Sequence, residues 1–484
     1  MSKAPLTKAE IRRRRKRNAI IVRCVLGLIL ILLIYLVVFL ITQKLLPIIK
    51  GQNETTAATT LAIPESSTEE TTEAQNVVGD RKDELLAQAD LLAAGYDYDA
   101  AIDLLKSFDD YENYPDMKEA VAGYEGQKAA CVPVDVTKVP HIFYHSLIND
   151  PDRVFDGDSD EHGYNVYMTT IEEFDKITQT MYDEGYVFVR LRDLVIETKD
   201  ENGDVHYEPN NQLMLPAGKK AVVISVDDLS YYHYMDDDGF PKKLVVDANG
   251  KVKCLVVKDD GTELIGDFDV VPRLNSFLEE HPDGAYKGAR GLIAMTGYDG
   301  VFGYRTDSDY RDRLALQADQ QEWLDRHPDF DFDAEVEQAK IVAEAIKESG
   351  WEFASHTWGH INVTNADLDR IMRDHEKWKE NVENIVGHTD TIIFAFGADI
   401  GSWTNYTADN EKYTYLRGQG FHFFCNVDSS PFWVQITDDY VRQGRRNLDG
   451  YLMYKSMTVD NNLEDLFHVE DVFDPVRPTP ISYE

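Results

Sequence analysis

Cysteine is scarce in this chain, and beyond position 23 basic residues are greatly outnumbered by acidic ones. The four cysteines among the 484 residues are widely separated and form no CxxC pair. This spacing argues against a disulfide framework and against a cysteine-based zinc site, so we expect ordinary buried thiols. The formal net charge is −38, although the first 23 residues carry nine Lys/Arg and a single acid. The acidic remainder argues against nucleic acid or an anionic membrane surface as its partner.

Long apolar runs are equally rare, with one exception. Residues 24–41, CVLGLILILLIYLVVFLI, are uncharged and about long enough to span a bilayer. They follow the basic block IRRRRKR, and no small-x-small cleavage site follows them. We therefore expect a basic cytoplasmic tail (1–23), one transmembrane helix (24–41) in the lipid bilayer, and the remainder outside the cell. A buried core helix is the alternative, but it leaves the arginine block unexplained.

Two segments of different composition precede the main body. Residues 51–80 are rich in Thr, Ser, Glu and Ala and poor in large apolar residues, which predicts a disordered stalk. Residues 83–131 have helical periodicity broken at Gly95 and resemble one tetratricopeptide-type helical pair followed by a third helix. One such unit is fewer than a self-standing solenoid needs. Two interpretations stay open: a spacer packed on the main domain, or a docking module for a protein partner.

Residues 139–484 alternate between strand and helix patterns, as is typical of an α/β fold. Amphipathic stretches such as 170–184 and 334–349 predict helices. The predicted strands are 139–145, 186–190, 221–226, 291–296, 351–355, 391–396 and 420–427. Seven strands predict an incomplete (β/α)7 barrel with its chemistry at the carboxyl ends of the strands. Asn249-Gly250 predicts a β-hairpin insertion near 242–257.

Polar motifs follow two of these strands. Strand 221–226 ends in the adjacent carboxylates Asp227 and Asp228, and the strand before HTWGH leads to His356 and His360. An HxxxH pair alone is more often two unrelated histidines on the surface or in the core. At the mouth of one barrel, however, two imidazoles and one carboxylate make a three-ligand metal site with open positions. The second carboxylate then points elsewhere and is placed to take a proton from an attacking water.

These motifs resemble those of the polysaccharide deacetylases of the NodB-homology type, carbohydrate esterase family 4. SVDDL (225–229) matches the family's TFDDG, and HTWGH (356–360) matches its H-[ST]-x-x-H. VPHIFYHSLI is similar to the family's first strand. The resemblance covers about residues 139–450 and implies a barrel of the NodB-homology type.

By this resemblance, Asp227 is the general base, and Asp228, His356 and His360 hold a divalent metal, with zinc as the expected ion. The implied activity is the removal of acetyl groups from N-acetylated cell-surface or cell-wall polysaccharide. In such a site, Asp227→Asn relieves like-charge repulsion, so we expect a variant that is no less stable than the parent.

The chain departs from the family pattern at two places. The third motif, RxPYG, falls on IFAFG, with Ile393 in the arginine position, and VRQGRR (441–446) is a candidate substitute. The late L-x-H histidine has only a poor match in His468. A non-catalytic glycan-binding or scaffold protein on the same fold is therefore the alternative. A hydrolase of small cyclic amides is a third interpretation, disfavoured by the anchor.

Several aromatic residues flank the two motifs. They are Tyr231, Tyr232, Tyr234 and Trp358. They either stack on sugar rings or cover the rim of the barrel, and the sequence favours neither interpretation.

Overall fold

The computed structural model describes residues 69–258, 260–314 and 316–483. The predicted tail (1–23), transmembrane helix (24–41) and first part of the stalk lie outside these residues. Among the described residues, no helix is long and apolar enough to cross a membrane. Val77–Glu484 form one compact unit.

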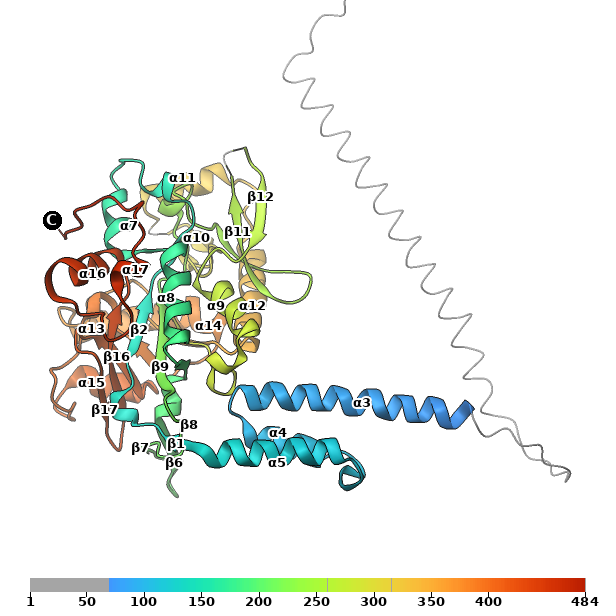
Figure 1. Cartoon of the computed structure of the whole chain (residues 1–484). Coiled ribbons are helices and arrows are strands. Elements are labelled where there is room, and N and C mark those ends of the chain that lie inside the picture. The colour runs from blue at the N-terminus through green and yellow to red at the C-terminus, as the bar shows by residue number, and fades with distance from the viewer. Residues whose placement is uncertain (1–68, 259, 315, 484) are drawn as a thin grey trace, which may run out of the picture. The chain divides into compact units, whose positions relative to one another are not determined.

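Seven parallel strands close a barrel within this unit (Figure 1). Around the ring they are β2 (His141–Tyr144), β9 (Lys220–Asp227), β13 (Leu292–Met295), β14 (Glu352–Ser355), β15 (Thr391–Ile393), β16 (Phe423–Val427) and β18 (Val441–Asn447). The parallel pairing of β18 with β2 closes the ring. The predicted (β/α) barrel is therefore confirmed.

Six of the seven predicted strands are in the barrel, and the seventh place is taken by a strand that was not predicted. The predicted strand 186–190 is β5 (Tyr186–Phe188), which pairs with the first residues of β9 and, through a single bridge, with Ala285. The second half of the same edge of β9 pairs with β13. The remaining place belongs to β18, whose sequence VRQGRRN is buried over its first six residues although it is mostly polar. Its polarity is why no strand was predicted there.

Strand alternation separates the barrel interior from its outer layer. On β9, Ala221, Val223, Ser225 and Asp227 share one face, and Val222, Ile224 and Val226 share the other. The second set packs in the apolar core that contains the covering helices, whereas Ala221 and Val223 belong to the core inside the barrel. Ser225 and Asp227 therefore lie above an apolar plug, toward the carboxyl ends of the strands.

Amphipathic helices cover the barrel. The longest are α8 (Ile171–Asp183), α9 (Val270–Glu280), α12 (Phe332–Glu348) and α13 (Leu368–Trp378). α8 begins with a capping box between Thr170 and Glu173 and ends before Gly185, which has a φ of 84°. Shorter helices are α6 (Pro151–Val154), α7 (Glu161–Tyr167), α10 (Ser308–Asp312), α11 (Ala318–Arg326), α14 (Asn384–Val386), α15 (Glu411–Gly418), α16 (Gly450–Lys455) and α17 (Val469–Val472).

Small antiparallel sheets decorate the barrel. The insertion after β9 forms a three-stranded sheet of β10 (Lys243–Val246), β11 (Val252–Val257) and β12 (Glu263–Gly266), with a turn at Asn249-Gly250. The remaining strands are β1 (Cys131–Pro133), β3 (Leu147–Ile148), β4 (Thr169–Thr170), β6 (Val195–Lys199), β7 (Val205–Pro209), β8 (Met214–Pro216) and β17 (Trp433–Ile436).

The helical segment before the barrel consists of α3 (Glu69–Ala94), α4 (Tyr98–Lys106) and α5 (Pro115–Ala130). α3 begins earlier than expected, so the last residues of the predicted stalk are helical. The buried side chains of α4 and α5 belong to the same apolar cluster as the barrel interior. Tyr96 also donates a hydrogen bond to the carbonyl of Asp283, at 2.7 Å. These contacts favour a unit packed on the main domain.

Candidate active site

A cavity of about 500 Å³ opens at the carboxyl ends of the barrel strands. Its lining includes all four residues predicted for the site: Asp227, Asp228, His356 and His360. Other lining residues come from distant parts of the chain and include Phe143, His145, Tyr167, Tyr234, Phe396, Arg445, Asp449 and Tyr483. This is the end of a (β/α) barrel at which catalytic residues are expected.

Asp228, His356 and His360 form a cluster that fits a metal ion. Their ligand atoms lie within 4.8 Å of one another. Nε2 of His360 is 3.5 Å from Oδ2 of Asp228, and the rings of the two histidines are 5.0 Å apart. Two imidazoles and one carboxylate are a donor set typical of catalytic zinc sites, which keep open positions for water and substrate. The three residues can therefore hold a divalent cation.

The proton of His356 is placed so that the ring can act as a ligand. Its Nδ1 lies 2.7 Å from the carbonyl oxygen of Ile393. A carbonyl only accepts, so Nδ1 carries the proton and Nε2 is left with a lone pair. Burial lowers the pKa of His356 below its ordinary value, although the carboxylates of Asp227 and Asp228 act in the opposite direction. The neutral imidazole that a metal requires is thus favoured.

The turn HTWGH is clamped by its neighbours. Thr357 and His360 have φ angles of 65° and 47°, in the left-handed region. The carboxylate of Asp374, on α13, accepts hydrogen bonds from the backbone amides of Trp358 at 2.7 Å and Gly359 at 2.9 Å. These bonds hold a turn that the residues alone disfavour, and they aim both histidines into the cavity.

Asp227 is buried and paired with Arg445 of β18. Nη1 and Nη2 of Arg445 lie 2.7 and 2.9 Å from the two carboxylate oxygens, a bidentate pair. Burial raises the pKa of Asp227, but the Arg445 guanidinium and His356 outweigh it and hold that pKa well below its ordinary value. Asp227 is therefore a carboxylate of fixed orientation. Arg445 supplies the guanidinium that is missing at Ile393.

Two histidines, His468 and His145, differ in whether they reach the cavity. The ring of His468 is 81% exposed and pairs with Glu464 at 2.6 Å, and it does not line the cavity. His145, which sequence reasoning missed, does line it. Nδ1 of His145 is 3.1 Å from the carbonyl oxygen of Tyr167, so the other ring nitrogen is the one left for the substrate. The available signal was its place at the end of the first barrel strand.

The aromatic residues near the motifs have different roles. Tyr234 lines the cavity, whereas Tyr231 is in the core. The hydroxyl of Tyr232 is 2.9 Å from Oδ1 of Asp228, to which it donates a hydrogen bond. Trp358 lies under the ammonium group of Lys377, 3.8 Å from its ring centroid. Of the four residues, only Tyr234 is available to a sugar in the cavity.

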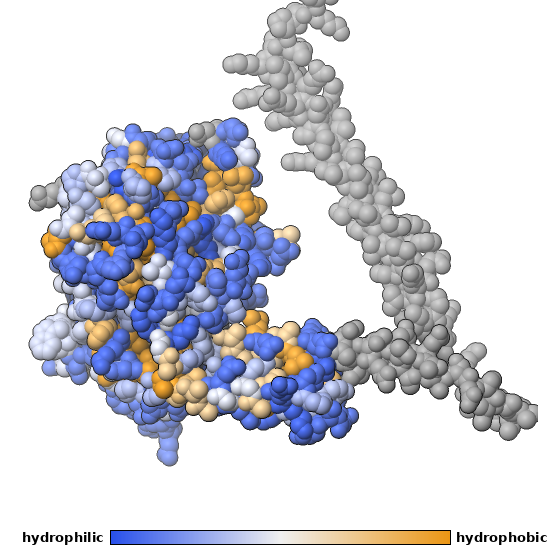
Figure 2. All heavy atoms as spheres, viewed as in Figure 1, coloured by the Kyte–Doolittle hydropathy of each residue, from blue (hydrophilic) through white to orange (hydrophobic). Residues whose placement is uncertain are grey.

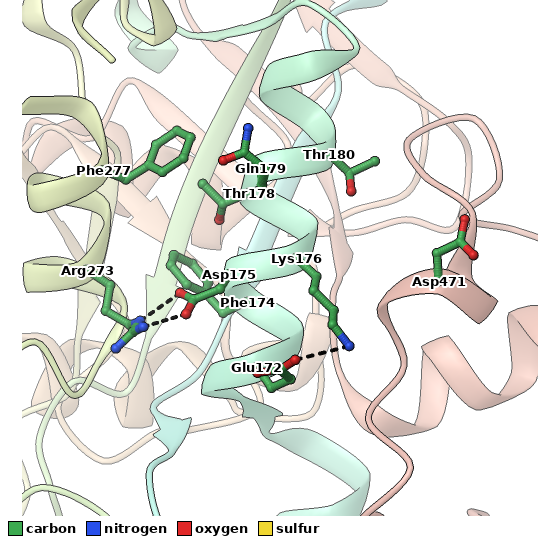
Figure 3. Close-up of a pocket in the computed structure, with 10 residues that line it drawn as sticks. All are labelled: Glu172, Phe174, Asp175, Lys176, Thr178, Gln179, Thr180, Arg273, Phe277 and Asp471. Carbon is green, nitrogen blue, oxygen red and sulfur yellow. Dashed lines mark hydrogen bonds and ion pairs between the residues drawn. The ribbon is translucent and has the colours of Figure 1, made fainter. Parts of the chain in front are cut away.

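A second cavity, of about 450 Å³, lies along the outer surface of α8 (Figure 3). Four of its charged side chains form two ion pairs, Arg273 with Asp175 and Lys176 with Glu172. None of the predicted site residues lines it. The cavity at the strand ends is therefore the candidate active site.

Comparison with known proteins agrees with this site. Residues 328–417 match the family model described as polysaccharide deacetylase, a segment that includes both cavity histidines but not Asp227 or Asp228. No curated protein matches the chain.

Two solved structures are similar to the chain. A Streptococcus pyogenes deacetylase, PplD, in complex with acetate, is 13% identical with a TM-score of 0.33, over 70% of this chain and 100% of that one. BC0361, a polysaccharide deacetylase from Bacillus cereus, is 12% identical with a TM-score of 0.31, over 68% of each chain. At these values the family match, and not the two structures, carries the assignment. The segment that holds His356 and His360 is therefore similar to the polysaccharide deacetylase family.

Proposed function

We propose that the protein is a metal-dependent N-deacetylase of an N-acetylated cell-surface or cell-wall polysaccharide. The observation that carries the proposal is the arrangement at the strand ends. One cavity contains a three-residue donor set and, beside it, a buried carboxylate held by Arg445. Deacetylation needs both an electrophilic centre and a base, and this cavity has residues for each.

The donor set Asp228, His356 and His360 would hold the cation, and zinc is the ion that best matches two imidazoles and one carboxylate. When bound, the cation would supply the Lewis acidity that polarises the acetamide carbonyl and activates the attacking water. Asp227 takes a proton from that water as the new carbon–oxygen bond forms. His145 gives a proton to the sugar nitrogen as the carbon–nitrogen bond breaks. The products are acetate and a free amino sugar, so the atoms balance.

Aromatic side chains around the cavity support a sugar as substrate. Four of the exposed aromatic residues line it: Tyr167, Tyr234, Phe396 and Tyr483, each between 48% and 66% exposed. Exposed apolar rings grouped around one cavity mark a binding surface, and flat rings suit the apolar faces of sugar rings. The polymer class stays part of the proposal.

We also propose that the domain works outside the cell, tethered to the membrane by residues 24–41. The basic block before that segment and its apolar character support this location. The lipid bilayer is thus the proposed second partner, and a protein partner for the helical unit is not proposed because its buried residues pack with the barrel.

A non-catalytic glycan-binding protein was the alternative because the family's arginine is absent from the third motif. With Arg445 on Asp227, that reason no longer applies. Two measurements test the choice: the metal content of the purified protein, and acetate release from chitin oligosaccharides, poly-N-acetylglucosamine and peptidoglycan. We expect about one zinc per chain, and acetate release that is lost on chelation and restored by zinc. Glycan binding without acetate release by the zinc-loaded protein would favour the alternative.

A further inference from the structure

Three polar residues lie inside the barrel, directly below the cavity. They are His141 of β2, Ser225 of β9 and Gln443 of β18, each no more than 1% exposed. The three strands are neighbours in the ring. Buried polar groups are costly unless each is hydrogen-bonded, so their partners decide what they do.

The amide of Gln443 has only one possible orientation. Its Nε2 lies 2.9 Å from the carbonyl oxygen of Val139, which can only accept a hydrogen bond. The amide oxygen therefore faces Nδ1 of His141, at 3.0 Å. Since that oxygen also only accepts, the proton of His141 is on Nδ1.

The orientation of Gln443 fixes which atom donates in each of the remaining hydrogen bonds. Burial and the Arg445 guanidinium lower the pKa of His141 well below its ordinary value, so its ring is neutral and Nε2 accepts. Nε2 is 2.9 Å from Oγ of Ser225, which must donate its proton there. The lone pairs of Ser225 then face Nη1 of Arg445, at 3.0 Å. Every bond in this chain has one allowed direction.

The chain ends at the proposed base. Nη1 of Arg445 donates to both Ser225 and Asp227, and Nη2 donates to the other oxygen of Asp227. Nε of Arg445 has no hydrogen-bond partner among the residues described. The terminal nitrogens, together with the ring of Phe143 at 4.1 Å, therefore set the plane of the guanidinium. If the hydroxyl of Ser225 were turned the other way, its hydrogen would face the Arg445 guanidinium, and Oγ could no longer accept the hydrogen bond from Nη1.

We propose that Gln443, His141 and Ser225 are positioning residues whose one-directional hydrogen-bond chain orients Arg445 and, through it, Asp227. This inference rests on the proposed deacetylation only for its kinetic consequence. These hydrogen bonds link the side-chain amide of Gln443, on β18, to the proposed base Asp227. This link is how the fold replaces an arginine of the third motif with one from β18.

The direction of these hydrogen bonds is tested without any assay of activity. Nitrogen-15 NMR of the histidine-labelled full chain should show His141 as a neutral ring protonated on Nδ1, with its signal assigned by loss in His141→Asn. A ring protonated on Nε2, or on both nitrogens at neutral pH, would overturn the proposed direction.

The positioning role is tested kinetically with Ser225→Ala. We expect kcat to fall about tenfold, as for the loss of one hydrogen bond to a charged group, while KM and metal content stay within about twofold of the parent. Ser456→Ala is the matched control, because it removes a buried hydroxyl that accepts a hydrogen bond from the backbone amide of Leu463, and neither residue lines the cavity. An unchanged kcat in a folded Ser225→Ala protein, or an effect on KM alone, would overturn the role. Failure of the parent to release acetate would instead refute the proposed function. The NMR result would still show whether the hydrogen bonds from Gln443 to Ser225 run in the proposed direction.

Discussion

Backbone conformation at single residues is unusual around the candidate active-site cavity. Asp228, Thr357, His360 and Phe396 all have φ angles between 47° and 65° without being glycine. Such conformations cost about 1–3 kcal/mol each and persist only where surrounding contacts impose them. Here the contacts are the Asp374 clamp, the Tyr232 hydroxyl and the packed strand ends. These conformations cost stability, and they direct the side chains of Asp228, His360 and Phe396 into the cavity.

The two adjacent carboxylates should respond differently to substitution by asparagine. Asp228→Asn removes an anionic ligand, so both metal content and acetate release should fall. Asp227→Asn leaves the three proposed ligands, so the metal should remain while the rate falls about 10²–10⁴-fold through loss of the base. Zinc stoichiometry and acetate release are measured for both variants in parallel. Full activity in a metal-loaded Asp227→Asn protein would exclude Asp227 as the base.

The stability of Asp227→Asn should also change, and in the direction opposite to the expectation from sequence. Repulsion between neighbouring carboxylates suggested no loss, but Asp227 pairs with buried Arg445. Removing one partner of a buried ion pair typically costs about 3–5 kcal/mol. Denaturant unfolding should show this loss, and adding Arg445→Met should recover part of it. A single variant as stable as the parent would mean that the ion pair is not formed.

His145 is expected to act as the acid that protonates the leaving nitrogen. His145→Gln should lower the rate of acetate release about 10²–10⁴-fold while zinc remains bound. His468→Gln is the matched control, because that ring is exposed and paired only with Glu464. Equal activity of the two variants would remove His145 from the mechanism.

Individual elements are held in place by buried polar groups as much as by apolar packing. β18 places Arg442, Gln443, Arg445 and Arg446 in buried positions, each with polar partners from other elements. The N-cap of α9 is Asp269, which is fully buried. Its carboxylate accepts from the amides of Leu147 and Val270, at 2.9 and 2.7 Å, and from the hydroxyl of Tyr231 at 2.6 Å. These groups join elements that are far apart in sequence.

The Asp269 cap should make stability depend on pH. Burial raises its pKa from 3.8 to about 6 despite the hydrogen bonds that oppose the shift. The folded state thus binds the proton more tightly than the unfolded chain, and this contribution is complete below about pH 4 and lost as pH rises through 6. Between pH 4 and pH 7, the stability of the parent relative to Asp269→Asn should fall by roughly 2–3 kcal/mol. A difference in unfolding free energy that is constant with pH would contradict the shifted pKa.

The whole molecule is acidic, with a formal net charge of −38. The face in Figure 2 is largely hydrophilic, and its apolar residues form separate patches. This charge keeps nucleic acid and other polyanions from being natural partners of the domain.

The proposed membrane anchor and its orientation are testable on intact cells. With the arginine block inside, residues from about Gly51 onward should be outside, and added protease should cut the Thr- and Glu-rich segment and release a soluble domain. Released domain is detected by immunoblotting of the supernatant. A domain protected in intact cells but digested after lysis would show the opposite orientation.

The helical segment should be required for the stability of the barrel. A chain starting at Val136 lacks α3–α5 and β1 and uncovers an apolar cluster shared with the barrel interior. Each large apolar side chain uncovered costs about 1.5–3 kcal/mol. Such a chain should melt at a clearly lower temperature than one starting at Val77, or fail to fold. Equal melting temperatures would show that the segment is only a spacer.

The sequence by itself predicted the barrel and the four residues Asp227, Asp228, His356 and His360, which the structure brings together in one cavity. Short apolar strands followed by Asp227-Asp228 and by HTWGH are local signals, and parallel strands bring their carboxyl ends together whatever the rest of the chain does. β18 was not predictable in this way. A strand of arginines and glutamine is stable inside a protein only when partners such as Asp227 and Asp399 neutralise it, and those partners are set by tertiary contacts. For the same reason the sequence did not show that His145 lines the cavity or that Asp227 pairs with Arg445, because both depend on which distant side chains lie close together.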